Sequence, residues 1–158
     1  PGVFGEGAIP DFKGDRTALE TVMAEQPEVL NHNLETVVRL QREVRTAAHY
    51  GRSLALLARA KAMNPAGLVK SGLMVGLGES DEEVRGTLAD LRAVGVDLVT
   101  IGQYLRPTAR HRPIHRYAPP EEFAAYRSLG AALGLRRVDA GPLVRSSYHA
   151  GAAHQAVG

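Results

Sequence analysis

The stretch Lys70–Leu77, KSGLMVGL, gives the clearest indication of fold class in this chain of 158 residues. It is largely apolar and lacks the strict alternation of a half-buried strand, which is typical of a strand buried on both faces of a parallel sheet. A helix is predicted directly after it, because Ser80 with Glu83 three positions later forms a capping-box pattern. This helix is expected to run to about Val94. A strand followed by a helix is half of a βαβ unit, so the stretch predicts an α/β fold.

On both sides of this stretch, strands and helices are predicted to alternate. Val96–Ile101 is rich in β-branched residues and is predicted to be a second buried strand after a helix that ends at Gly95. Further strands are predicted at 29–33 and 135–139, and further helices at 18–24, 34–45, 53–63 and 121–133. Residues 1–15 carry four glycines and two prolines and are expected to be irregular. A first residue other than methionine leaves open whether Pro1 is a natural start.

The spacing of these elements predicts how they assemble. Strand and helix recur about every 30 residues, the spacing of βαβ units that build a parallel sheet with right-handed crossovers. A closed eight-unit barrel needs roughly 250 residues, so a barrel in this chain is partial. We therefore expect one domain over residues 1–158, a partial (βα) barrel with a parallel sheet and outer helices. Residues 1–9 are expected to form an irregular start and residues 150–158 a flexible tail.

Composition narrows the possible functions. No apolar run approaches the roughly 20 residues that cross a bilayer, so no membrane is expected as a partner. No secretory signal pattern opens the chain, which points to the cytoplasm. A net charge of +2 is too small to indicate a nucleic-acid partner, and no aromatic residues interleave the clustered arginines. The chain has no cysteine, so its own residues cannot build a disulfide or a thiolate-held iron–sulfur cluster.

Polar residues and glycines follow each predicted strand. In parallel α/β sheets the functional groups gather at the carboxyl ends of the strands, so these residues are candidates for a site. In chain order they are Asn31, His32, Asn33 and Glu35, then Gly76, Gly78 and Glu79, then Gln103, Tyr104 and Arg106, and finally Arg145 to His149. Their convergence is a stronger indication of a site than any one motif.

Each group also has a purely structural explanation. His32 and its flanking asparagines can close a strand-to-helix turn. Gly76-Leu77-Gly78 can hold an anion on free backbone amides, although such glycines usually form only a tight turn. The loop at 104–120 carries Arg106, Arg110, Arg112 and Arg116 and is by default a solvated surface. Its density of positive charge nevertheless favours an anionic partner.

Five segments together resemble the carboxyl-terminal half of lipoyl synthases. In order they are PDFKGD (10–15), NHNLET (31–36), KSGLMVGLGES (70–80), IGQYLRP (101–107) and GPLVRSSYHA (141–150). The match is colinear and covers nearly everything from Ile9 to Ala150. The resemblance implies a transferase of lipoate biosynthesis with a partial α/β barrel. This radical S-adenosylmethionine enzyme inserts two sulfurs into a protein-bound octanoyl chain to make the lipoyl group.

The same resemblance implies cofactor-binding residues in two segments. Asn31, Asn33 and Glu35 in the first segment are expected to contact adenosylmethionine. Gly76 and Glu79 in the glycine-rich segment are expected to lie near the same cofactor. No residue of this chain is assigned a catalytic role.

The motif RSSY implies a metal ligand near the end of the chain. In the family, one serine oxygen of this motif binds an iron of an auxiliary 4Fe–4S cluster. Because adjacent strand residues point to opposite faces, only one of Ser146 and Ser147 can face the site, and the family pattern points to Ser147. Arg145, directly before them, is expected to bind a cofactor. A hard alkoxide ligand differs from soft thiolates and suits a cluster that is dismantled during turnover.

The absence of cysteine departs from the family pattern. The resemblance implies two 4Fe–4S clusters held by cysteine triplets in an amino-terminal half, so this chain alone is expected to supply one serine ligand and to be inactive. Its expected partners are octanoylated lipoyl-carrier domains and a cysteine-bearing amino-terminal half. Residues 1–8, PGVFGEGA, replace an apolar strand of the family and look like a truncation, a frameshift junction or the start of a separately encoded half.

An alternative function remains open from the sequence. In this alternative, the chain is a noncatalytic half-barrel module that docks acidic lipoyl-carrier domains through its basic loop.

Overall fold

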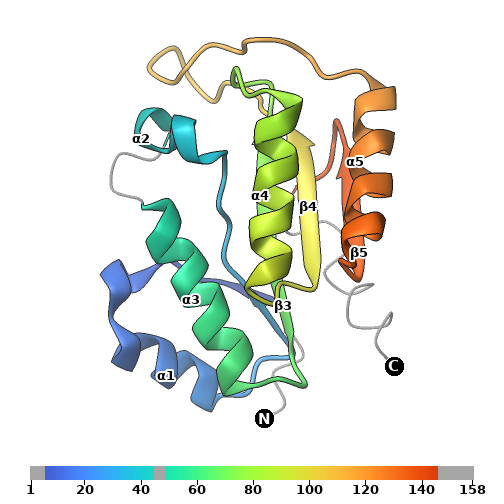
Figure 1. Ribbon diagram of the computed structural model, residues 1–158. Coiled ribbons are helices and arrows are strands. Elements are labelled where there is room, and N and C mark those ends of the chain that lie inside the picture. Colours follow the sequence, from blue (N-terminus) through green and yellow to red (C-terminus); the bar gives the residue numbers. More distant parts are fainter. Residues whose placement is uncertain (1–5, 45–48, 146–158) are drawn as a thin grey trace.

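A parallel sheet of five strands organises the fold (Figure 1). A computed structural model describes residues 6–44 and 49–145. The strands are β1 (Glu6–Ala8), β2 (Val29–Asn31), β3 (Leu68–Val75), β4 (Leu98–Gln103) and β5 (Arg137–Gly141). Each strand pairs in parallel with the next one along the chain, so the order in the sheet is β1-β2-β3-β4-β5. This order without reversal is that of a barrel wall, and it confirms the predicted α/β class with a partial barrel.

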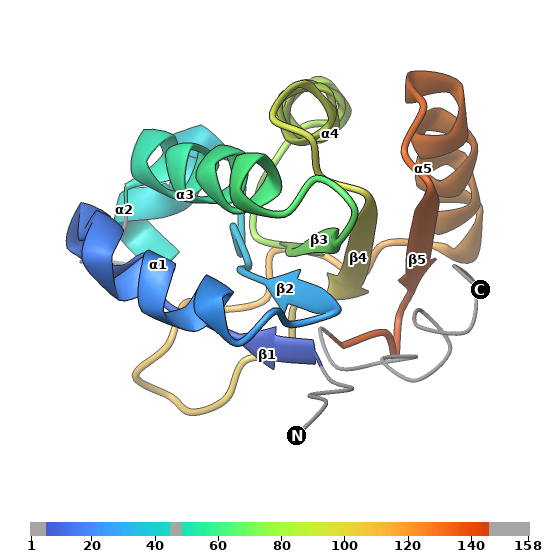
Figure 2. The ribbon, with the colours of Figure 1, turned by 90° about the horizontal axis from the view of Figure 1, so that it is seen from below.

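The main helices cover one side of the curved sheet (Figure 2). They are α1 (Arg16–Ala24), α3 (Tyr50–Met63), α4 (Asp81–Ala93) and α5 (Pro120–Leu133), with a short α2 (Gln41–Val44) and two 3-10 turns, η1 (Phe12–Gly14) and η2 (Val38–Leu40). The main core fills the space between the sheet and these helices; its fully buried members include Leu19, Leu57, Leu88, Ile101 and Phe123. None of the helices that the structure describes has the length and apolar character needed to cross a bilayer.

The predicted unit around β3 is confirmed. Apart from half-buried Met74, every residue of β3 is buried, Lys70 and Ser71 included, as the largely apolar stretch indicated. Ser80 caps α4, since its hydroxyl accepts from the Glu83 amide at 3.1 Å and the Glu83 carboxylate accepts from the Ser80 amide at 2.9 Å. Gly134 ends α5 with a φ of +90°, a left-handed conformation that glycine adopts without strain.

Residues 6–15 are more ordered than predicted. Glu6–Ala8 form β1, which pairs with β2 at the edge of the sheet, so the expected irregular start over residues 1–9 is wrong there. Phe12–Gly14 form η1, capped by the side chain of Asp11. A strand of three residues that includes a glycine carries no periodic signal, and it is recognised by its pairing with β2. Residues 150–158, the predicted tail, lie outside the described residues.

The helix predicted at 34–45 is also largely wrong. The segment after β2 stays extended because Glu35 pairs with β3: the Glu35 amide donates to the Gly72 carbonyl at 3.0 Å, and the Met74 amide donates to the Glu35 carbonyl at 2.8 Å. Helical structure begins only at η2 and α2. Pairing with a neighbouring strand thus overrides the helical spacing of the apolar residues.

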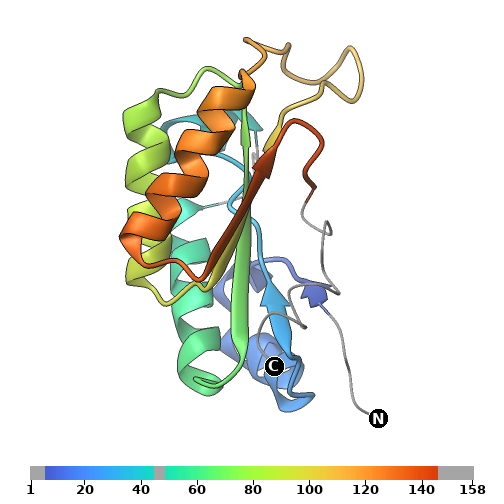
Figure 3. The ribbon, with the colours of Figure 1, turned by 90° about the vertical axis from the view of Figure 1, so that its right-hand side faces the viewer.

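The register aligns side chains in rows on the sheet face away from the helices. Residues paired across parallel strands project to the same face. One row is Asn31, Lys70 and Leu98, and the next is Gly72, Thr100 and Asp139. Figure 3 shows the helices on one side and the loop at 104–119 reaching past the strand ends toward the other side.

Candidate functional site

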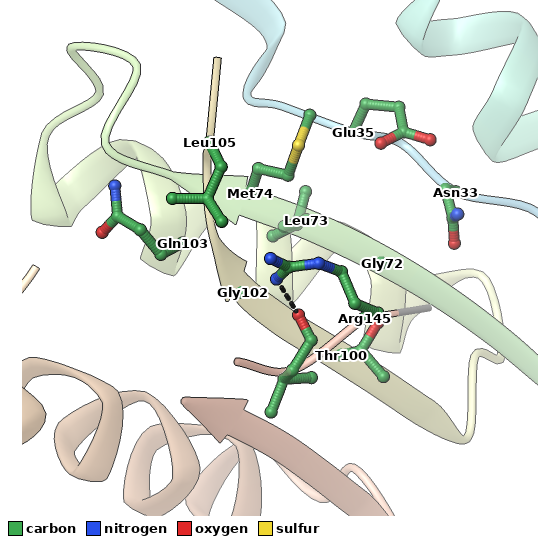
Figure 4. Close-up of a pocket in the computed structure, with 11 residues that line it drawn as sticks. Asn33, Glu35, Gly72, Leu73, Met74, Thr100, Gly102, Gln103, Leu105 and Arg145 are labelled. Carbon is green, nitrogen blue, oxygen red and sulfur yellow. Dashed lines mark hydrogen bonds between the residues drawn. The ribbon is translucent and has the colours of Figure 1, made fainter. Parts of the chain in front are cut away.

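A cavity of about 220 Å³ lies on this second face, over the carboxyl-terminal halves of β3 and β4 (Figure 4). Its polar lining comes from separate parts of the chain: Asn33 and Glu35 follow β2, Thr100 and Gln103 belong to β4, and Arg145 follows β5. The remaining lining residues are Gly72, Leu73, Met74, Gly102, Leu105 and Val144. The cavity therefore brings together three of the predicted site residues, Asn33, Glu35 and Arg145.

Two glycines make the room for this cavity. A Cβ on Gly72 would stand 2.7 Å from the Thr100 hydroxyl oxygen and 2.8 Å from the Asn33 side-chain oxygen, closer than nonbonded atoms approach. A Cβ on Gly102 would collide with the carbonyl oxygen of Val144. Any side chain at these two positions would displace the polar groups around it, so glycine here keeps both the space and the polar lining.

Glu35 adopts an unusual backbone conformation at the cavity. Its φ of +70° lies in the left-handed region that residues other than glycine rarely occupy. The two backbone hydrogen bonds with β3 described above hold it there. Such a conformation costs on the order of 1–3 kcal/mol and tends to occur where function requires a particular placement of a side chain.

Arg145 closes the cavity on the side of β5. Its guanidinium donates to the Val144 carbonyl at 2.8 Å, as the dashed line in Figure 4 indicates. The arginine is exposed, so it keeps donors free to meet a ligand. Ser147, the predicted iron ligand, and Ser146 lie outside the described residues.

Asn31 lies near the cavity without lining it. It is 1% exposed and sits in the row next to that of Gly72. Among residues 6–44 and 49–145, its side-chain oxygen has no hydrogen-bond partner. Buried acceptors nearly always accept a hydrogen bond, so this oxygen can accept one from a bound ligand.

The glycine-rich turn after β3 holds an anion that belongs to the chain itself. The Glu79 carboxylate accepts from the Gly76 amide at 3.0 and 3.1 Å and from the Leu77 amide at 3.0 Å. Neither Gly76 nor Glu79 lines the cavity. The backbone amides of Gly76 and Leu77, which the sequence suggested as an anion site, therefore already bind a carboxylate of the chain. Gly76 is best explained as part of a tight turn.

His32 has a structural role. Its buried ring lies 2.7 Å from the Ile9 carbonyl oxygen through Nδ1 and 2.8 Å from the Ser53 hydroxyl through Nε2. The imidazole thus joins the segment after β1, the end of β2 and helix α3. Both ring nitrogens are engaged within the protein, so His32 has a structural role, but it does not close the strand-to-helix turn that the sequence suggested.

The basic loop, residues 104–119, is largely bound to the rest of the chain. Arg112 pairs with Glu43 and donates to the Leu77 carbonyl at 3.1 Å, and Arg116 donates to Glu122 at 2.8 Å. Arg106 donates to two carbonyls of the loop itself. Two of the four arginines thus have a carboxylate partner within the chain, and the contacts give no support to the docking-module alternative.

A second, more apolar cavity of about 420 Å³ lies between this loop and α2. Met74, Leu77, Tyr104, Leu105 and Pro107 contribute its apolar lining. It shares Glu35, Met74 and Leu105 with the first cavity, so the two adjoin.

Sequence reasoning missed several lining residues. Thr100 and Gly102 lie inside β4, whereas the sequence pointed only to the residues that follow that strand. A polar residue and a glycine within the apolar run LVTIG at 98–102 were the available signal, because such residues inside a buried strand need a partner or a close neighbour.

The donor set fits a small polar cofactor better than a metal. An amide, a carboxylate and a guanidinium around a glycine floor offer both donors and acceptors, as an amino acid or nucleoside requires. Over residues 6–44 and 49–145, no group of three or more His, Asp or Glu residues could hold a metal ion. The whole chain also lacks a cysteine thiolate for a cluster.

The fold and the cavity define part of an α/β barrel with its binding site at the carboxyl ends of the strands. No family model matches the chain. It is 57% identical over 150 residues to the lipoyl synthase of Rubrobacter xylanophilus, an alignment that covers 95% of the chain and 47% of the relative. The lipoyl synthases of Chlorobaculum parvum and Thermus thermophilus are 57% and 56% identical, again over 95% of the chain and over 51% and 47% of the relatives.

Over nearly its whole length the chain is similar to lipoyl synthases, and the share of each relative that it matches is the share expected of a carboxyl-terminal part. It spans about half the length of the curated relatives that it matches.

Proposed function

We propose that this chain is the carboxyl-terminal part of a radical S-adenosylmethionine sulfurtransferase that converts protein-bound octanoyl groups into lipoyl groups. The observation that carries the proposal is the cavity at the carboxyl ends of the strands, whose polar residues Asn33, Glu35 and Arg145 lie in segments of the family resemblance. Identity above 50% over nearly the whole chain supports the same conclusion. Residues 1–158 act as a single partial-barrel domain in this proposal.

Adenosylmethionine is the cofactor that the first cavity would hold. Asn33 and Glu35 offer an amide and a carboxylate to its polar groups, and Asn31 offers a buried acceptor beside them. The guanidinium of Arg145 offers donors from the opposite wall. When bound, this cofactor supplies the radical chemistry, while the residues of the chain bind and orient it.

The iron–sulfur clusters require residues from outside this chain. Since it has no cysteine, two 4Fe–4S clusters need a cysteine-bearing half, and Ser147 is the one ligand that this chain would add. The complete enzyme would act in the cytoplasm on octanoylated lipoyl-carrier domains. In the cavity between the loop and α2, Met74, Leu77 and Leu105 offer apolar surface to an acyl chain, beside charged residues such as Glu43 and Arg110.

The decisive experiment restores the missing half. The chain is co-expressed with the cysteine-bearing half of a lipoyl synthase, reconstituted with iron and sulfide, and supplied with adenosylmethionine, a reductant and an octanoylated carrier domain. Mass spectrometry of the carrier is expected to show two sulfur atoms added only when both halves are present. A stable complex of the two halves with both clusters but no sulfur transfer would contradict the proposal, as would failure of the halves to associate.

A further inference from the structure

The turn after β3 and the basic loop are joined by one buried carboxylate and one arginine. We infer that Glu79 and Arg116 are positioning residues, which hold the basic loop against the end of β3 and thereby form the outer wall of the apolar cavity. The inference rests on the proposed function only where it concerns turnover. Its structural part concerns the described residues alone.

Glu79 is placed to organise the turn rather than to meet a ligand. Its side chain is only 1% exposed, and both carboxylate oxygens accept hydrogen bonds from the turn amides of Gly76 and Leu77. A buried carboxylate with satisfied oxygens still needs a countercharge. The nearest cation is Arg116, with its Nη2 atom 3.6 Å from a Glu79 oxygen.

Arg116 carries this link into the loop and onward to α5. Its Nη2 atom donates to both carboxylate oxygens of Glu122 at 2.8 Å, and the surrounding carboxylates raise the pKa of Arg116, Glu122 most of all. One guanidinium therefore bridges the turn after β3 and the first turn of α5. Because it pairs with two carboxylates, replacing it removes the one ion pair within 4 Å that the described residues give Glu79, and leaves Arg39 as the further cation that interacts with it.

The backbone of the loop is fixed at the same place. The side-chain Nε2 of Gln103 donates to the Arg116 backbone carbonyl at 2.9 Å, and its Oε1 accepts from the backbone amide of Ala118 at 2.9 Å. The His115 amide donates to the Gly76 carbonyl at 2.8 Å. A Cβ on Gly76 would stand 2.6 Å from the Arg116 carbonyl oxygen, so glycine is required there for the loop to lie this close.

The consequence of this attachment lies at the cavity. The loop supplies Leu105, Pro107, Arg110 and His111 to the apolar cavity, and Leu105 also lines the first cavity. Neither Glu79 nor Arg116 lines either one. Glu79 and Arg116 therefore act on the two cavities only through the loop. Glu35, by contrast, lines both cavities itself.

Amide hydrogen exchange of the full chain, followed by NMR, tests the structural part. In Glu79→Gln and in Arg116→Met, protection of the Leu77 and His115 amides is expected to fall about tenfold to a hundredfold, as for the loss of a charge-assisted hydrogen bond. The Asp97 amide, which donates to the Val69 carbonyl at the opposite end of β4, serves as the internal reference and is expected to stay unchanged. Arg116→Lys keeps the cation and is expected to restore most of the protection of His115.

Two further variants make the outcome decisive. The double variant Glu79→Gln with Arg116→Met is expected to be no worse than the worse single variant, because the two side chains act as a pair. Glu20→Gln makes the same charge change in the exposed pair with Arg16 and is expected to leave the loop amides unchanged. Unchanged protection of His115 in Arg116→Met, whose side chain is one-third exposed and whose loss the fold should tolerate, would overturn the inference. Equal loss at Asp97 would also overturn it, since that result indicates general destabilisation.

Kinetics of the two-half enzyme test the functional part. Positioning through the loop predicts that Glu79→Gln and Arg116→Met raise the KM for the octanoylated carrier by a similar factor. Both variants are expected to change the KM for adenosylmethionine less and by an equal factor, because Leu105 alone carries the loop into the first cavity. A direct cofactor contact of Glu79 predicts a change in the KM for adenosylmethionine in Glu79→Gln alone. If the unaltered halves give no turnover, the proposed function fails, while the exchange data still decide whether the loop is held as inferred.

Discussion

The carbonyl oxygen of Val144 lies over the Cα of Gly102, where a Cβ would otherwise stand. Through this contact the segment after β5 folds back onto β4 and brings Arg145 to the cavity. The width of the cavity therefore depends on the missing side chain of one residue in the middle of the sheet.

Gly102→Ala is expected to push this segment away and to destabilise the chain by about 1–3 kcal/mol, the usual effect of overpacking. Denaturant unfolding measures the change. Gly86→Ala is the matched control, because its site in α4 is exposed with no heavy atom within 4 Å of the added Cβ. It is expected to stabilise the chain by about 0.5–1 kcal/mol. Equal effects of the two substitutions would mean that the Val144 contact does not constrain Gly102.

Ser53→Ala is expected to lower the free energy of unfolding by about 1–3 kcal/mol, because it leaves Nε2 of the buried His32 without its partner. Thr21→Ala removes a hydroxyl that donates to a backbone carbonyl on an exposed helix surface and is expected to change stability by less than about 0.5 kcal/mol. Thermal unfolding compares the two. A Ser53 variant as stable as the Thr21 variant would show that the imidazole does not depend on this contact.

The ion pair between Arg39 and Glu83 is expected to give a stability that depends on pH. Hydrogen bonds from Arg39 and from the Ser80 amide lower the pKa of Glu83 from 4.5 to about 2. A lowered folded-state pKa stabilises the fold fully above pH 4.5, and that contribution disappears as the pH falls to about 2.

Glu83→Gln should therefore flatten the stability profile across this window. Because the Arg39 side chain is 56% exposed, the effect is expected to be about 0.2–1 kcal/mol. Denaturant titrations at several pH values measure it. A profile that stays as steep in the variant would assign the acid sensitivity to other carboxylates.

The purified chain, reconstituted alone with iron and sulfide, is expected to hold no stoichiometric 4Fe–4S cluster, because it has no thiolate to bind one. Iron analysis and the visible absorption spectrum provide the measurement. A stable cluster with four irons per chain would refute the assignment of the cluster ligands to another half.

In the two-half enzyme, Ser147→Ala is expected to abolish lipoyl formation while reductive cleavage of adenosylmethionine continues, because only the auxiliary cluster loses a ligand. Ser146→Ala is its matched control and is expected to have the milder effect. Assays of deoxyadenosine and of the modified carrier separate the two activities. If both variants transfer sulfur normally, Ser147 is not an iron ligand.

The parts of the fold that the sequence predicted well are those with local determinants. Helix α4 begins at the Ser80 capping box, and α5 ends at Gly134, whose positive φ the sequence could indicate. Strand β1 and the extended segment around Glu35 were missed, because both are fixed by pairing with strands distant in sequence. Local periodicity contains no information on such pairing.

The candidate site was predicted in part for a related reason. Asn33, Glu35 and Arg145 meet because the carboxyl ends of parallel strands share one edge, which chain order alone implies. Glu79 was expected at the cofactor, yet its carboxylate occupies the amides of its own turn. Whether a carboxylate reaches inward or outward depends on a few backbone angles that residue types do not specify.

The strand order of the sheet bears on how such a protein can be divided. Every strand pairs only with its neighbours along the chain. Dividing the chain between two successive strand–helix units therefore breaks the backbone pairing of a single pair of strands. No segment of one piece passes between the strands of the other. Each piece keeps its own strands with the helices that cover them. We therefore expect that an architecture of this kind can be divided between two polypeptides that assemble edge to edge.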